Sequence, residues 1–249
     1  MSRDKGVIVD LIIFDKDGVL LDLTSTWLPV ATDITHHLSA LTHHKVPAAK
    51  FQEIIGIDET TKHIDPDGLF AAGSFLDQQQ ACAAHAPELG AHYATPAYHE
   101  AIMAIVDRNA QRAPVPLGEI EQTLQALKKS GYLLAVLTND SEKSAKRSLD
   151  KMNISHFFEK VVGYDSGYGG KPEPAGFHAI CEACGTTADK TIMIGDTGAD
   201  KNVAIAAQAG LFVGISACYP EPTKALEGTT HLLPTIEGLP DLLAKTAPR

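Results

Sequence analysis

The segment LIIFDKDGVLLD, residues 11–22, is the starting point for predicting the fold. Its first four residues, Leu11 to Phe14, are apolar, and a short apolar run of this kind predicts a strand buried on both faces. Asp15 and Asp17 follow at the end of that strand. Two carboxylates this close raise each other's pKa unless a positive group neutralises them. The pair is therefore either a solvated turn or a cation site that does chemistry, and this stretch does not decide between the two.

After residue 116, apolar strands alternate with amphipathic helices. We predict strands at 132–138, 160–163, 190–195 and 211–216, and helices at 117–131, 174–184 and 199–210, with a further helix opening in the polar stretch after 138. Strands that alternate with helices indicate a doubly wound, parallel sheet in an α/β fold.

The segment between the first strand and residue 116 has a different pattern. It contains stretches of helical periodicity, and no part of it is a convincing strand. We therefore predict a helical cap domain at 22–115, inserted into an α/β core formed by 1–21 and 116–249, with APVP (113–116) as the linker. A loop at 65–74 either faces the site or is a simple connector.

Composition narrows the class of protein. Of 249 residues, 44% are hydrophobic and 21% are charged, which is ordinary for a globular chain. The net charge of −10 argues against a nucleic-acid partner, which needs basic patches. The N-terminus is too charged for a signal peptide, and no stretch reaches transmembrane length, so we expect no membrane association. Four cysteines are too few for a disulfide framework, which favours a cytoplasmic enzyme.

Polar side chains gather at the predicted carboxyl ends of the strands, where open α/β sheets bind ligands. They are Asp15, Asp17, Thr138, Asn139, Asp140, Lys171, Asp196 and Asp200. Acids, a hydroxyl and a lysine from four separate segments thus converge on one edge, which favours chemistry over a solvated turn. Asp140 can instead cap the next helix, and we leave it outside the site.

This set of side chains suits phosphoryl transfer. Hard oxygen ligands without histidine or cysteine favour magnesium over zinc. One carboxylate can attack phosphorus to form an aspartyl-phosphate, and a second can protonate the leaving oxygen and then activate water. A lysine, a hydroxyl and backbone N–H groups can hold the phosphoryl oxygens.

Four of these segments resemble motifs I to IV of the haloacid dehalogenase superfamily, in the usual order. They are FDKDGVL, LTND, the lysine of GGKPEP, and IGDTGAD. A DxD motif alone would be weak evidence for this superfamily, but the four motifs together are highly specific for it. Val19 stands where threonine is commoner, and Lys16 fills a variable position.

The resemblance implies a role for each matching residue. It makes Asp15 the nucleophile, Asp17 the general acid/base and Lys171 the residue that neutralises phosphate charge. The phosphate-binding groups that it implies are Thr138, Asn139 and Gly18. The Mg²⁺ site that it implies is formed by Asp15, the backbone carbonyl of Asp17, Asp196 and Asp200, with Asp200 acting directly or through water. Asp17 separates phosphate-transferring members from dehalogenases, which lack this second acid.

The place of the insertion resembles the C1-type cap of phosphoglycolate-phosphatase-like members. This implies a magnesium-dependent phosphatase acting on a small phosphorylated metabolite. Residues 22–115 carry five Lys and Arg against eleven Asp and Glu, which favours a small monophosphate, such as phosphoglycolate or a sugar phosphate, over a nucleotide. A β-phosphoglucomutase-like phosphosugar mutase shares the motifs and stays open, and a catalytically silent binding protein is a third reading. We expect a monomer or homodimer.

Two other patterns have plainer explanations. Eight of the eleven histidines fall in the insertion, and we interpret most of them as solvated surface. Cys181 and Cys184 form a C-x-x-C pair after His178, but no second pair completes a zinc site, so core packing is favoured.

Overall fold

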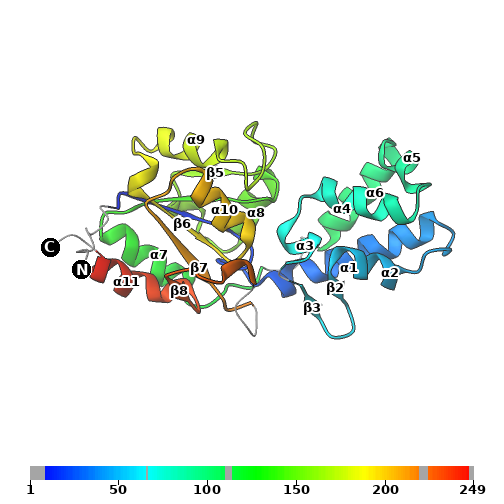
Figure 1. Cartoon of the computed structure of the whole chain (residues 1–249), viewed down its shortest axis with the longest axis horizontal. Coiled ribbons are helices and arrows are strands. Elements are labelled where there is room, and N and C mark those ends of the chain that lie inside the picture. The colour runs from blue at the N-terminus through cyan, green and yellow to red at the C-terminus, as the bar shows by residue number, and fades with distance from the viewer. Residues whose placement is uncertain (1–8, 66, 110–113, 219–223, 247–249) are drawn as a thin grey trace. The chain divides into compact units, whose positions relative to one another are not determined.

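The computed structural model describes residues 9–65, 67–109, 114–218 and 224–246 (Figure 1). The chain divides into two compact units. The core unit is residues 1–22 with 116–249, and the cap unit is residues 23–115. The boundary predicted after residue 21 lies one residue before this division. The predicted linker at 113–116 begins at Ala113, which lies outside the described residues.

A six-stranded parallel sheet forms the centre of the core unit, which confirms the α/β class. Its order is β5-β4-β1-β6-β7-β8. The strands are β1 (Leu11–Phe14), β4 (Leu133–Leu137), β5 (Lys160–Val162), β6 (Thr191–Gly195), β7 (Leu211–Ile215) and β8 (Leu232–Leu233). The quoted apolar run is thus the central strand, with β4 on one side and β6 on the other. β8 was not predicted, since two residues are too few to show a period.

Helices cover both faces of this sheet. They are α7 (Ile120–Lys129), α8 (Glu142–Lys151), α9 (Ala175–Ala183), α10 (Gly198–Ala206) and α11 (Leu239–Thr246). Ile12 and Phe14 belong to the cluster with α7, α8 and α11, whereas Leu11 and Ile13 belong to the cluster with α9 and α10. Figure 1 shows α9 and α10 on the opposite side of the sheet from α7 and α11. All four residues of β1 are therefore buried, which is why its sequence is uniformly apolar.

The cap unit is helical, as predicted for the insertion. Its helices are α1 (Leu23–Leu41), α2 (Ala48–Ile55), α3 (Leu69–Ala72), α4 (Phe75–His85), α5 (Leu89–Tyr93) and α6 (Pro96–Asn109). The expectation of no strand was wrong, because β2 (Ile57–Asp58) pairs antiparallel with β3 (His63–Ile64). The segment 65–74 contains the short α3 and ends at Ser74, which caps α4 through a reciprocal contact with Asp77.

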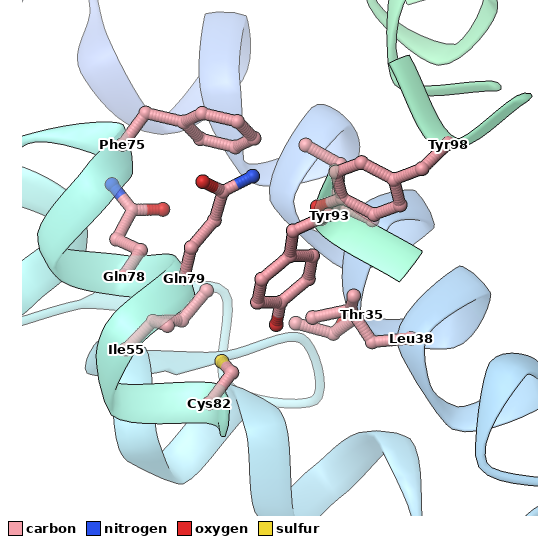
Figure 2. Close-up of a pocket in the computed structure, with 10 residues that line it drawn as sticks. Thr35, Leu38, Ile55, Phe75, Gln78, Gln79, Cys82, Tyr93 and Tyr98 are labelled. Carbon is pink, nitrogen blue, oxygen red and sulfur yellow. The ribbon is translucent and has the colours of Figure 1, made fainter. Parts of the chain in front are cut away.

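Figure 2 shows a small cavity inside the cap unit, lined by residues of α1, α2, α4, α5 and α6. Leu38, Cys82, Tyr93 and Tyr98 are among its lining residues. Its volume is about 20 Å³, enough for roughly one water molecule. The Tyr93 hydroxyl is buried here and has no hydrogen-bond partner among the described residues. The cavity is therefore too small to be a substrate pocket.

None of the helices in the described ranges combines the length and the apolar character needed to cross a membrane.

Candidate active site

The predicted site lies at the carboxyl end of β1, where the order of the sheet reverses. Successive strands run outward from β1 through β4 to β5, and the chain then returns to add β6 on the other side of β1. Such a reversal is the usual ligand position in an open α/β sheet. Asp15 follows β1, Thr138 follows β4 and Asp196 follows β6, so neighbouring strands supply the three side chains.

Lys171 connects the acids of this edge. Its Nζ lies 2.8 Å from Asp15 Oδ1 and 2.7 Å from Asp200 Oδ1, and all three side chains are buried. Burial alone would lower the pKa of Lys171, but the two carboxylates outweigh it and raise that pKa. The lysine therefore keeps its charge, and its role in neutralising phosphate stays a prediction.

Asn139 holds the backbone that carries this lysine. Its Oδ1 accepts from the Lys171 N–H at 2.7 Å, and its Nδ2 donates to the Lys171 carbonyl at 3.1 Å. In this structure the amide thus positions Lys171, and the phosphate contact implied for Asn139 stays a prediction. Thr138 is also buried, and its Oγ1 accepts from the Asp140 N–H at 3.2 Å. Its phosphate contact likewise stays a prediction.

Asp200 has two structural roles at once. It sits at the third position of α10, where its Oδ2 accepts from the N–H and the hydroxyl of Thr197 at 3.0 and 2.7 Å. Its other oxygen binds Lys171. Asp200 therefore does more than stabilise the start of a helix. Its carboxylate belongs to the capping box of α10 and also contacts Lys171 in the site.

Three buried carboxylates form a group suited to a metal ion. One oxygen from each of Asp15, Asp196 and Asp200 lies within 4.8 Å of the others, and no other set of three potential ligands comes this close within the described ranges. Burial raises the pKa of Asp15 to about 7; Lys171 opposes this shift, and Asp200 and Asp17 add to it. With Lys171 included, the ionised group carries two excess negative charges, which a divalent cation would balance. The all-oxygen donor set fits Mg²⁺.

Gly18 makes room for this group. It has φ +78°, and a Cβ added to it would lie 1.9 Å from Asp196 Oδ2. The glycine after the second aspartate is therefore required by both backbone conformation and space. Its predicted role in phosphate binding stays a prediction. The Asp17 carboxylate is not in the metal group, and the metal contact implied for its backbone carbonyl stays a prediction.

Lys16 and Asp140 are the neighbours that the sequence interpretation missed. Lys16 was taken as filling a variable position, but its side chain is fully buried and contacts both Asp17 and Asp140. The expectation that Asp140 caps the next helix was wrong, because Ser141 is the residue whose side chain caps α8. The only signal in the sequence was a lysine placed between two aspartates on a buried strand end.

Comparison with known proteins identifies the family. Residues 9–210 match the haloacid dehalogenase-like hydrolases. The chain belongs to this family. The match extends across the cap unit as well as most of the core, and it includes each predicted site residue.

Individual relatives of this haloacid dehalogenase-like hydrolase match only in part. A phosphoglycolate phosphatase from Aquifex aeolicus is 40% identical over 85 residues, which is 34% of this chain and 40% of that protein. The chain spans about half the length, or less, of the curated relatives that it matches.

Solved structures agree with the fold over almost the whole chain. A predicted phosphoglycolate phosphatase from Haemophilus somnus has a TM-score of 0.70 at 21% identity, covering 94% of this chain and 97% of that one. A Thermotoga maritima protein provisionally named a β-phosphoglucomutase has a TM-score of 0.66 at 17% identity, covering 95% and 99%. At these identities the likeness shows the fold alone.

The histidines and cysteines of this hydrolase lie outside the metal group. His36 is exposed and contacts Glu59 at 3.2 Å, and no cap histidine belongs to a group of three potential ligands among the described residues. Cys181 is buried in the core cluster, and Cys184 packs against it. Core packing therefore accounts for the C-x-x-C pair.

Replacing Gly18 with alanine should damage both stability and activity. The new Cβ meets the Asp196 carboxylate and is also strained by the positive φ, a strain of about 1–2 kcal/mol by itself. Gly131→Ala is the matched control, since its φ is +91° but nothing lies within 4 Å of the added Cβ. Urea unfolding and assays of both variants should show a larger stability loss for Gly18→Ala, and a loss of activity only there. Equal losses would contradict the steric role of Gly18.

Proposed function

We propose that this haloacid dehalogenase-like hydrolase is a Mg²⁺-dependent phosphatase that cleaves a small phosphomonoester through an aspartyl-phosphate on Asp15. One observation carries the proposal: the buried Asp15 carboxylate lies 2.8 Å from the Lys171 ammonium and within 4.8 Å of Asp196 and Asp200. A nucleophile, a cation for phosphate and a metal-binding acid group thus share one site.

The chain's own residues provide each step of the reaction. Asp15 attacks phosphorus, so that a bond from its carboxylate oxygen to phosphorus forms while the ester P–O bond breaks. Asp17 gives its proton to the leaving oxygen and the free alcohol departs. Water then attacks the phosphorus of the acyl phosphate and passes a proton to Asp17, which releases inorganic phosphate and regenerates Asp15. Lys171, with the Thr138 hydroxyl, balances charge on the phosphoryl oxygens throughout.

The metal would be held by Asp15, Asp196 and the backbone carbonyl of Asp17. When bound, Mg²⁺ supplies Lewis-acid stabilisation of the phosphoryl charge. We assign Asp200 to a contact through water, because both of its oxygens already accept hydrogen bonds from Lys171 and Thr197.

We propose a small monophosphate as the substrate. Two observations support this class: the phosphoglycolate phosphatases among the relatives, and the excess of acidic residues in the insertion, which disfavours a nucleotide. Four cysteines in 249 residues are too sparse for a disulfide framework, which supports the cytoplasmic location that we propose.

A phosphosugar mutase is the second candidate, supported by the fold of the Thermotoga maritima protein. A panel of phosphate esters assayed with Mg²⁺ separates the two candidates. A phosphatase releases inorganic phosphate, whereas a mutase returns an isomerised sugar phosphate. Isomerised product without free phosphate would overturn the phosphatase proposal, and absence of any turnover would favour a binding protein.

We also propose that the cap unit selects the substrate while the core unit does the chemistry. Leu76, 60% exposed on α4 next to the segment 65–74, is a test position, and Ile205, 65% exposed on α10, is its matched control in the core unit. Leu76→Gln should change the ranking of esters by kcat/KM, because specificity is differential transition-state binding. Ile205→Gln should leave the ranking unchanged. Lys171→Ala should lower kcat/KM by the same factor for every ester. This division would be contradicted if Leu76→Gln changed kcat/KM by one factor for every ester, or if Lys171→Ala changed the ranking of the esters.

A further inference from the structure

Each catalytic carboxylate of the proposed reaction has a lysine of its own. Lys171 lies between Asp15 and Asp200, as described above. Lys16 lies in the same way between Asp17 and Asp140: its Nζ is 2.9 and 2.8 Å from the two oxygens of Asp17, and 3.1 Å from Asp140 Oδ2. The nucleophile and the acid/base therefore belong to two separate lysine–dicarboxylate units.

The unit around Lys16 is buried. The Lys16 side chain is 0% exposed, and those of Asp17 and Asp140 are 14% and 10% exposed. A buried ammonium is tolerated when anions compensate it. Asp17 and Asp140 are the two anions that compensate the Lys16 ammonium. Because its ammonium is closed off from solvent, Lys16 is placed to act on Asp17 rather than on substrate.

Asp140 is itself fixed in place. Its Oδ1 accepts from the Ser141 N–H at 2.7 Å, and its own N–H donates to Thr138 Oγ1 at 3.2 Å. Asp140 is thus tied to the end of β4, while Lys16 and Asp17 belong to the end of β1. The Lys16–Asp140 pair links two adjacent strand ends, and this link determines where Lys16 can hold the Asp17 carboxylate.

We propose that Lys16 is a positioning residue for the reaction, holding both oxygens of Asp17 while Asp140 anchors Lys16. The proposal rests on the proposed function, in which Asp17 exchanges a proton with the leaving oxygen. Without the ammonium, Asp17 and Asp140 would face each other as like charges within about 6 Å, and like charges at that range repel. The Asp17 carboxylate would then leave the position that Lys16 now gives it.

A displaced acid affects some substrates more than others. An alkyl phosphate needs a proton on its leaving oxygen, whereas p-nitrophenolate departs without one. The value of kcat/KM reports the steps up to phosphoryl transfer to Asp15, so it excludes the later attack by water. The ratio of kcat/KM for an alkyl phosphate to that for p-nitrophenyl phosphate therefore measures how well Asp17 is placed, independently of general damage to the site.

The test compares Lys16→Met with Lys128→Met, which removes a solvent-exposed pair to Glu159 in the same unit. We expect the ratio to fall about 10²-fold in Lys16→Met, the size of effect that a misplacement near 1 Å has on catalysis. Lys128→Met should leave it unchanged. The double variant Lys16→Met/Asp140→Asn removes the carboxylate left facing Asp17, so it should regain unfolding free energy over Lys16→Met without regaining the ratio. If Lys16→Met does not fold, the ratio is measured on the double variant instead.

Three results would overturn the role of Lys16. In the first, Lys16→Met lowers kcat/KM for both esters by the same factor. In the second, the double variant recovers the wild-type ratio. In the third, Lys128→Met changes the ratio as much as Lys16→Met does. Failure of the proposed function has a different signature, since the wild-type protein would then turn over neither ester. That result would refute the phosphatase and the role of Lys16 together.

Discussion

Asp15→Asn should lower kcat for every phosphate ester by at least about 10³-fold, roughly 4 kcal/mol of barrier. The asparagine keeps the shape of the side chain but removes the anionic oxygen that attacks phosphorus. The fold should survive, because burial raises the pKa of Asp15 to about 7, so that its ionised form opposes folding at neutral pH. Circular dichroism and urea unfolding should therefore show an unfolding free energy equal to or above that of the wild type.

The matched control for this variant is Asp150→Asn, on an exposed position of α8 in the same unit. It should retain wild-type activity. Rapid quenching with a labelled ester should trap a phosphorylated wild-type enzyme, and no label should attach to the Asp15→Asn protein. Activity of Asp15→Asn within about tenfold of wild type, a difference of about 1.4 kcal/mol, would exclude this residue as the nucleophile.

Removal of the metal should have an effect of similar size. After chelation the protein should lose at least about 10²-fold in kcat, because the charge on the transferred phosphoryl group is then stabilised by Lys171 and Thr138 without the cation. Added Mg²⁺ should restore activity. Ca²⁺ should not, since its larger and looser coordination shell misplaces the nucleophile and the phosphate.

Thermal unfolding gives a second readout of the metal that does not depend on turnover. At a hundredfold excess over its dissociation constant, Mg²⁺ should stabilise the wild type by about 2.7 kcal/mol. Asp196→Asn should abolish most of this gain, because it removes one member of the buried acid group. Full activity in the chelated enzyme, equal rescue by Ca²⁺, or an unchanged Mg²⁺ effect in Asp196→Asn would each contradict the proposed metal site.

Most of the core of this protein was predictable from local pattern. The central strand and four of the other five strands are apolar runs long enough to be predicted as strands, and only the two-residue β8 was missed. The same limit explains the missed β2–β3 pair in the cap unit, where each strand also has two residues. Strands this short depend on their hydrogen-bonded partner rather than on a period in the sequence.

The acid group of the site was predictable for a topological reason. The carboxyl ends of parallel strands meet at one edge of the sheet, so Asp15 and Asp196 must come together once their strands are adjacent. The motif spacing adds Lys171 and Asp200 to that edge. What the pattern could not show is which atoms pair, for instance that both amide atoms of Asn139 bind the backbone of Lys171.

The parallel α/β core, the helical insertion and the edge where the acids and the lysine gather could all be predicted, because strand type, helix period and motif order are local properties of the chain. The pairing of Lys16 with Asp140 depends instead on how the strands are arranged in the folded chain. This contact exists because β1 and β4 pair in one register, with Phe14 beside Val136, and this places two strand ends within reach of one buried ammonium. Side-chain pairing across strands is set by register and burial, and neither can be read from the residues that flank a lysine.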